Sequence, residues 1–220
     1  MALFFLQVQK LMELRFKKIL ILFILTTYVS CSNDKKIETN IKSIKIEAAQ
    51  KKVLMIGNSF TFYWNLPQVL EAMFDSSNLN IKVFQKTTGG SKLFEHWNYN
   101  KVDNYNIKNY DFIVLNDHST YPLTQIDTCA KYISLFTKYI EEANKKTFIY
   151  GTWEYPYLKN ISSIKSTNTM QILDSLSKLN NATYVPVGNA FDYIENQFPE
   201  INLYMDDEKH PSPNATYLAA

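Results

Sequence analysis

Cysteine and histidine are scarce in this chain, which has 2 cysteines and 3 histidines among its 220 residues. Two cysteines allow at most one disulfide, which excludes a disulfide-rich scaffold. The histidines show no HxH or HxxxH spacing, so the sequence offers no metal-binding motif, and we expect no metal and no other cofactor. An excess of one charge is also lacking. The formal net charge is only +2 and lysines are interleaved with acidic residues, so we expect no nucleic-acid partner.

The composition is that of a globular protein, with 46% hydrophobic and 20% charged residues. The length suits one domain with a tail. Aromatic residues make up 15% of the chain. Core packing explains that share, and a surface on which sugars stack is the alternative.

The N-terminal segment has the pattern of an export signal. Arg15, Lys17 and Lys18 precede the apolar run 19–25, which is shorter than the roughly 20 residues that span a bilayer. An uncleaved anchor helix is the alternative. Ser30-Cys31 resembles the end of a bacterial lipoprotein signal, which implies that Cys31 is lipidated.

The resemblance predicts an exported protein of the cell envelope that a lipid anchor holds on a bacterial membrane. Tyr28 departs from the pattern, because leucine is usual three residues before the cysteine. We expect a signal at 1–31, a flexible polar tether at 32–50 and the folded domain at 51–220. Cys129 is then expected to be a buried thiol on a helix.

In the domain, short apolar stretches alternate with longer segments whose apolar residues recur at helical spacing. This pattern predicts five strands, at 53–56, 81–84, 112–115, 147–150 and 183–187. Helices are expected at 66–74, 126–140, 166–179, 189–197 and 214–220, with Thr124 and Asp127 as a capping box. The alternation implies an α/β fold, a three-layer α/β/α sandwich around a five-stranded parallel sheet. The last predicted helix has no stop signal, so we expect it to be truncated.

Ser59 follows the first predicted strand by two residues, in the segment Gly57-Asn58-Ser59. Ligands of open α/β folds bind at this edge of the sheet. Gly57 permits a sharp turn, and a helix N-terminus supplies free N–H groups. Taken alone, Ser59 is more readily explained as a helix cap.

Asp207 and His210 lie three residues apart near the C-terminus, followed by Pro211 and Pro213. A histidine can deprotonate a serine near neutral pH, and an aspartate can orient its ring. The alternative is a solvated loop in which the two residues occur together by chance.

The two segments together resemble the first and last sequence blocks of the SGNH/GDSL hydrolases. That family also has a glycine after strand two and an asparagine after strand three, which Gly90 and Asn116 match here. The resemblance covers about residues 51–220 and implies a flavodoxin-like fold. Asn58 replaces the commoner aspartate, and Val114 replaces a usual glycine.

The resemblance implies a catalytic triad of Ser59, His210 and Asp207. It also implies an oxyanion hole formed by the N–H groups of Ser59 and Gly90 and the side chain of Asn116. His96 and His118 are weaker candidates for substrate contact, against packing in the core or at the surface.

The expected function is a serine esterase or deacetylase that acts on small-molecule or acylated-carbohydrate esters. The alternative is an inactive surface lipoprotein of the same fold that binds a carbohydrate or another ligand. An α/β-hydrolase is disfavoured, because Thr61 stands at the second glycine of that family's nucleophile elbow.

Overall fold

The computed structural model describes residues 49–99 and 102–220. The predicted signal segment at 1–31, with Cys31, and nearly all of the predicted tether at 32–50 lie outside the described residues. In the described part of the chain, no helix has both the length and the apolar character needed to cross a bilayer.

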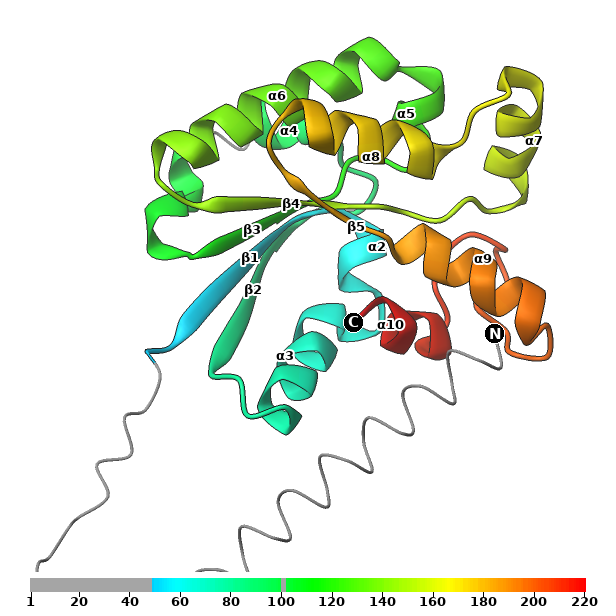
Figure 1. Cartoon of the computed structure of the whole chain (residues 1–220), viewed down its shortest axis with the longest axis horizontal. Helices are drawn as coiled ribbons and strands as arrows, with labels where there is room; N and C mark the ends of the chain where they lie inside the picture. Colours follow the sequence, from blue (N-terminus) through cyan, green and yellow to red (C-terminus); the bar gives the residue numbers. More distant parts are fainter. Residues whose placement is uncertain (1–48, 100–101) are drawn as a thin grey trace, which may run out of the picture. The chain divides into compact units, whose positions relative to one another are not determined.

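Five parallel strands form one sheet in the order β2-β1-β3-β4-β5 (Figure 1). β2 continues beyond its predicted end because Thr87 pairs with Gly57 of the neighbouring strand. β5 stops before Pro186, which lacks the N–H that a strand needs and caps the next helix instead. All five predicted strands are confirmed: β1 (Lys51–Gly57), β2 (Ile81–Thr87), β3 (Phe112–Leu115), β4 (Lys146–Tyr150) and β5 (Thr183–Val185).

The connections between strands are mostly helical. The longer helices are α3 (Leu66–Ser76), α6 (Ile126–Glu142), α7 (Pro156–Lys165), α8 (Thr169–Leu179) and α9 (Val187–Gln197). The shorter ones are α2 (Ser59–Phe62), α4 (Leu93–Asn98), α5 (Tyr121–Thr124) and α10 (Pro213–Ala219), with single 3₁₀ turns at η1 (Tyr63–Asn65), η2 (Val102–Tyr105) and η3 (Ile107–Asn109).

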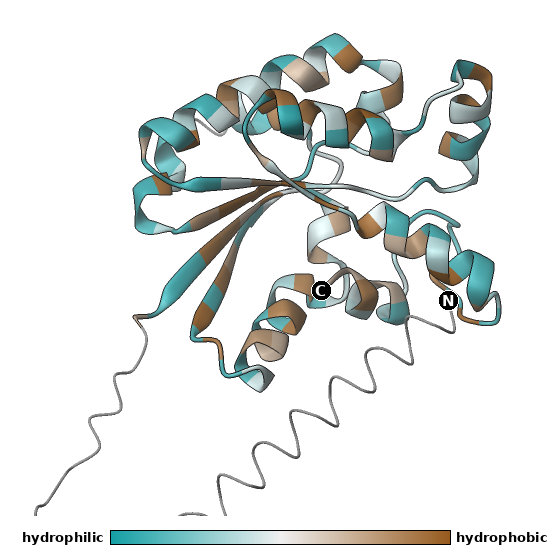
Figure 2. Ribbon diagram, viewed as in Figure 1, coloured by the Kyte–Doolittle hydropathy of each residue, from teal (hydrophilic) through white to brown (hydrophobic). Residues whose placement is uncertain are grey.

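Successive residues of a strand pack alternately into two separate hydrophobic cores, one on each face of the sheet. Leu54 and Ile56 of β1 pack beneath α4, α6 and α8, whereas Val53 and Met55 face α2, α3, α9 and α10 (Figure 1). Figure 2 shows hydrophobic residues along the strands of the sheet between the two helical layers. The expected three-layer α/β/α architecture is confirmed, because a sheet with helices on both faces must be apolar on both.

Some details of the helices differ from the prediction. α6 begins after Gln125, which makes no side-chain cap, and the Thr124 hydroxyl donates back to the Thr120 carbonyl. The predicted capping box is therefore wrong. The prediction of a buried thiol on a helix is confirmed, because Cys129 of α6 is fully buried and has no disulfide. α7 was not predicted, because its sequence has weak amphipathic periodicity and few apolar residues.

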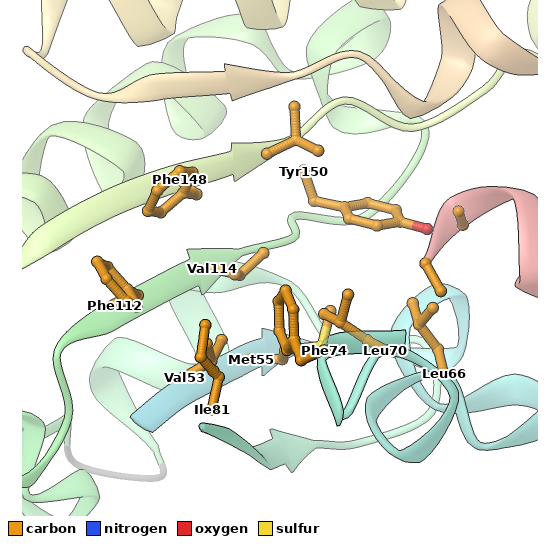
Figure 3. Close-up of a pocket in the computed structure, with 13 residues that line it drawn as sticks. Val53, Met55, Leu66, Leu70, Phe74, Ile81, Phe112, Val114, Phe148 and Tyr150 are labelled. Atoms are coloured by element: carbon orange, nitrogen blue, oxygen red, sulfur yellow. The ribbon is translucent and has the colours of Figure 1, made fainter. Parts of the chain in front are cut away.

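An apolar cavity of about 270 Å³ lies between the sheet and α3, with α10 at its margin. Figure 3 shows Val114 and Met55 pointing into it from neighbouring strands, together with the Tyr150 ring. Val114 thus replaces the glycine usual in the family on the face of β3 that lines this cavity. The cavity does not include Ser59 or His210.

Candidate active site

The carboxyl ends of β1, β2 and β3 bring three predicted site segments to one edge of the sheet. Gly57 pairs with Thr87 at the end of β2, and Ile56 pairs with Leu115 at the end of β3. Ser59, Gly90 and Asn116 each follow one of these strand ends by one to three residues. The sheet order thus gathers residues that are far apart in the sequence.

Asn58, and not Ser59, caps the helix that carries the candidate nucleophile. The Asn58 side-chain oxygen accepts a hydrogen bond from the Phe60 N–H at 3.1 Å. Gly57 has no room for a side chain, because a Cβ there would lie 2.8 Å from Thr61 Oγ1 and 2.9 Å from Asn116 Cβ. This tight turn leaves the Ser59 hydroxyl free for another partner.

Ser59, His210 and Asp207 form a continuous hydrogen-bonded series. Ser59 Oγ lies 2.9 Å from His210 Nε2, and His210 Nδ1 lies 2.5 Å from Asp207 Oδ2. The Asp207 carboxylate also accepts hydrogen bonds from the backbone N–H groups of His210 and Lys209, at 2.9 and 3.1 Å. A carboxylate that holds one imidazole nitrogen leaves the other free to accept the serine proton.

The electrostatics of the series favour an ionised carboxylate. Partial burial opposes the charge on Asp207, but the hydrogen bonds from the His210 side chain and backbone outweigh it and lower the pKa of Asp207 to about 2. Asp207 therefore remains negatively charged through the neutral range and favours the proton on His210 Nδ1.

Aromatic rings enclose the imidazole of His210 on two sides. The Tyr63 ring stacks on it with a centroid separation of 4.4 Å and an interplanar angle of 15°. The Phe60 ring meets it edge-on at 5.6 Å. Phe60 in turn begins a stack of three rings in which Trp153 lies between Phe60 at 4.3 Å and Phe191 at 4.2 Å. The imidazole is therefore held by packing as well as by Asp207.

The backbone beside the site is strained. Trp64 has φ 48° and ψ 26°, and Asn65 has φ 59° and ψ 45°, so two consecutive residues adopt the left-handed conformation. This conformation costs a residue with a Cβ about 1–2 kcal/mol. It is tolerated readily by asparagine but is an outlier for a bulky aromatic residue.

A hollow of about 500 Å³ opens above Ser59 and His210. We call it the aromatic bowl. One wall is aromatic and another is glycine backbone, and the complete lining is Ser59, Phe62, Tyr63, Trp64, Gly89, Gly90 and His210. Gly90 has φ +68°, which favours glycine, and a Cβ there would meet no atom within 4 Å.

Asn116 does not line the aromatic bowl. It is 1% exposed and lies beside Gly57, and its side-chain amide has no hydrogen-bond partner among the described residues. A buried amide without a partner is costly and marks a position where another polar group can bind. The structure thus gathers Ser59 and Gly90 at the bowl and places Asn116 immediately behind the turn.

Neither of the two other histidines lines the bowl. His96 is 1% exposed, and Nε2 lies 2.8 Å from the Gly57 carbonyl oxygen while Nδ1 lies 2.7 Å from the Tyr105 hydroxyl. The ring of His96 is therefore engaged in the interior, which favours the alternative of core packing over substrate contact. His118 is half-buried, and its Nδ1 lies 2.9 Å from the Thr120 hydroxyl.

The structural roles of two buried polar residues at this edge, Asn58 and Asp117, were not predicted from the sequence. The Asn58 amide donates to the Ser91 and Asp117 carbonyl oxygens, each at 3.1 Å. The Asp117 side chain accepts from the N–H groups of Leu93 and His118 at 2.9 and 2.7 Å, and burial raises its pKa. The replacement of aspartate by asparagine at position 58 could have indicated the first of these contacts, because an amide donates hydrogen bonds and a carboxylate does not. Among the described residues, no group of three or more His, Cys, Asp or Glu side chains is arranged to hold a metal ion.

No family model matches the chain, and no curated protein sequence matches it either. Several solved structures, however, are similar to this chain. A protein assigned to the SGNH hydrolases, from Slackia heliotrinireducens, is 24% identical with a TM-score of 0.66, over 77% of this chain and 95% of that one. An acetyl xylan esterase is 15% identical with a TM-score of 0.61, over 76% of this chain and 94% of that one.

A GDSL-like lipase from Parabacteroides merdae is also similar, at 15% identity and a TM-score of 0.59, over 79% of this chain and 94% of that one. The chain therefore has the fold of the SGNH hydrolases, and the fold implied by the sequence blocks is confirmed.

Proposed function

We propose that the protein is a serine hydrolase that cleaves ester bonds with Ser59, His210 and Asp207. The observation that carries the proposal is the hydrogen-bonded series from Asp207 Oδ2 through His210 to Ser59 Oγ. Its order and distances are those that general-base activation of a serine requires. The similarity in fold to structures of esterases supports the same reaction class.

In the proposed reaction, Ser59 Oγ attacks the ester carbonyl carbon as His210 Nε2 takes the hydroxyl proton. The negative charge on the carbonyl oxygen is stabilised by the N–H groups of Ser59 and Gly90 and by the amide of Asn116. The ester C–O bond then breaks, and the alcohol leaves with the proton from His210. Water, deprotonated by His210, cleaves the acyl-serine and releases the carboxylic acid.

The shape of the aromatic bowl supports a neutral substrate with a flat or ring-shaped portion. Its aromatic and glycine walls carry no charged side chain apart from the ionisable His210. Aromatic rings stack on the apolar faces of sugars. We therefore propose small esters of neutral alcohols, acylated carbohydrates included; two of the similar structures are named as acetyl xylan esterases.

The reaction class is tested by Ser59→Ala. We expect this variant to lose turnover of p-nitrophenyl acetate, whereas Ser163→Ala, an exposed serine of α7, keeps it. A fluorophosphonate probe should label the wild type at Ser59 and leave Ser59→Ala unlabelled. Wild-type turnover by folded Ser59→Ala would refute the mechanism, and a wild type that neither labels nor turns over would favour the inactive binding protein.

The substrate class is tested separately, with acetylated xylooligosaccharides against p-nitrophenyl esters of increasing acyl length. We expect release of acetate from the sugar and a fall in turnover as the acyl chain lengthens. Cleavage of aryl esters alone would leave the reaction class standing and remove the carbohydrate proposal.

We also propose that the protein is exported and anchored to a bacterial membrane by a lipid on Cys31. This rests on the basic residues, the short apolar run and the Ser30-Cys31 pair of the sequence. Growth with an alkyne fatty acid should label the wild-type chain in the membrane fraction. Cys31→Ala should lose the label, and labelling that survives this substitution would contradict the proposal.

A further inference from the structure

We propose that Trp64 is a positioning residue for His210, which acts by holding the carbonyl group next to it. The inference rests on the proposed function of Ser59 and His210. The Trp64 indole N–H donates to the Pro211 carbonyl oxygen at 2.9 Å. Pro211 directly follows His210, so this bond ties the chain beside the nucleophile to the chain beside its base.

Two side-chain hydrogen bonds join residues 59–65 to residues 207–213 in the described part of the chain. One is the bond between Ser59 Oγ and His210 Nε2, and the other is the bond from Trp64 to Pro211. The first must break whenever Ser59 is bonded to an acyl group, because the hydroxyl proton has then been transferred. The second involves no reacting atom and persists through the cycle.

Other anchors of the His210 loop come from other directions. The Met205 N–H donates to the His210 carbonyl oxygen at 2.9 Å, and the Trp153 indole N–H donates to the Lys209 carbonyl oxygen at 3.1 Å. These bonds fix the loop to itself and to the segment after β4. Of these three hydrogen bonds to the loop, only the one from Trp64 is donated by the segment 59–65 that carries Ser59.

The strained backbone of Trp64 supports a specific need for its side chain. Its φ of 48° turns the chain between α2 and α3 and aims the indole toward the C-terminal loop. Glycine or asparagine would adopt this conformation with less strain but cannot reach Pro211 with an indole N–H. Strain that a small residue would relieve is a feature of positions where the side chain has a function.

Half of the Trp64 surface is exposed, at 51%, because the ring also lines the aromatic bowl. A wall residue and a positioning residue are distinguished by kinetics. Loss of a wall weakens substrate binding and raises KM, whereas misplacement of His210 slows the chemical steps and lowers kcat.

Trp64→Phe separates the two roles, because phenylalanine keeps a ring and the same backbone strain but lacks the N–H. We expect kcat for p-nitrophenyl acetate to fall about tenfold with KM changed less than about twofold, and fluorophosphonate labelling to slow in parallel. Trp97→Phe is the matched control, since Trp97 packs against Phe136 and Tyr139 away from the bowl, and it should keep wild-type kcat.

Unchanged kcat in Trp64→Phe, or a change in KM alone, would overturn the proposal. Ser59→Ala is measured in the same assay. If Ser59→Ala is inactive and Trp64→Phe is unchanged, the positioning role of Trp64 fails and the proposed function stands. A second measurement uses the wild-type chain. Hydrogen exchange of the Trp64 indole N–H should stay slow after the fluorophosphonate has modified Ser59, and exchange as fast as that of a free indole would also overturn the proposal.

Discussion

The Asn58 side-chain amide donates a hydrogen bond to the Asp117 carbonyl oxygen over 3.1 Å and thereby joins the turn after β1 to the turn after β3. The same nitrogen donates to the Ser91 carbonyl oxygen. Asn58 is 3% exposed, and both of these hydrogen bonds are buried. The residue that precedes the candidate nucleophile thus links the segments that follow β1, β2 and β3.

Asn58→Asp is expected to destabilise the protein, although aspartate is the commoner residue of the family. A carboxylate cannot donate to either carbonyl and would face two acceptors. We expect a loss of about 2–4 kcal/mol at neutral pH, measured by urea unfolding. The buried carboxyl of the variant should have a raised pKa, so its folded state binds a proton at higher pH than its unfolded state, and the deficit should shrink as pH falls. A neutral effect at all pH values would contradict this account.

Asp207→Asn should leave the loop folded and remove most activity. The remaining side-chain oxygen can still accept from the N–H groups of Lys209 and His210, but the new amide donates toward His210 Nδ1. The imidazole would then carry its proton on Nε2 and could not accept one from Ser59. We expect kcat for p-nitrophenyl acetate to fall by about 10²–10⁴-fold in a variant that still unfolds cooperatively.

The pH dependence of the wild type follows from the same carboxylate. With a pKa of about 2 in the folded state, below the unfolded value of about 3.9, Asp207 favours folding above pH about 4. This contribution is lost as pH falls through about 4 to about 2. The free energy of unfolding, measured with urea, should therefore fall over this pH range, and it should fall less in Asp207→Asn. An equal fall in Asp207→Asn would contradict the assignment of the low pKa to Asp207.

Asn116→Ala tests the oxyanion hole. Its unpartnered amide is expected to act only when negative charge develops on the substrate, so kcat should fall by about 10²–10³-fold. Folding should not suffer the loss of a hydrogen bond, because the amide has none among the described residues. Fluorophosphonate labelling and p-nitrophenyl acetate turnover should fall together, and unchanged turnover would exclude Asn116 from the hole.

His96→Gln tests whether the buried histidine is structural. Burial lowers the pKa of His96, so the unfolded chain binds a proton that the folded chain resists, and stability falls as pH drops below about 6.5. Replacement by glutamine should flatten this dependence, measured by thermal unfolding at pH about 5 and about 8. KM should change less than about twofold, because the ring is buried; a large rise in KM would instead support substrate contact.

The sheet and most helices could be predicted because their signals are local. The apolar run 53–56 and the periodicity after Leu66 each specify an element with no knowledge of its neighbours. The position of His96 could not be predicted from the sequence, because it depends on the Gly57 carbonyl, 39 residues away, and on Tyr105. The roles of Asn58 and Trp64 escaped for the same reason, since Asp117 and Pro211 are their partners only once the fold has formed.

The stack of Phe60, Trp153 and Phe191 joins the short helix of the nucleophile to the segment after β4 and to α9. The position of Ser59 therefore also depends on residues that do not contact the substrate. An engineer who wished to retune turnover could repack this column from the α9 side and leave every reacting group as it is. Natural substitutions in α9 would change turnover by the same route.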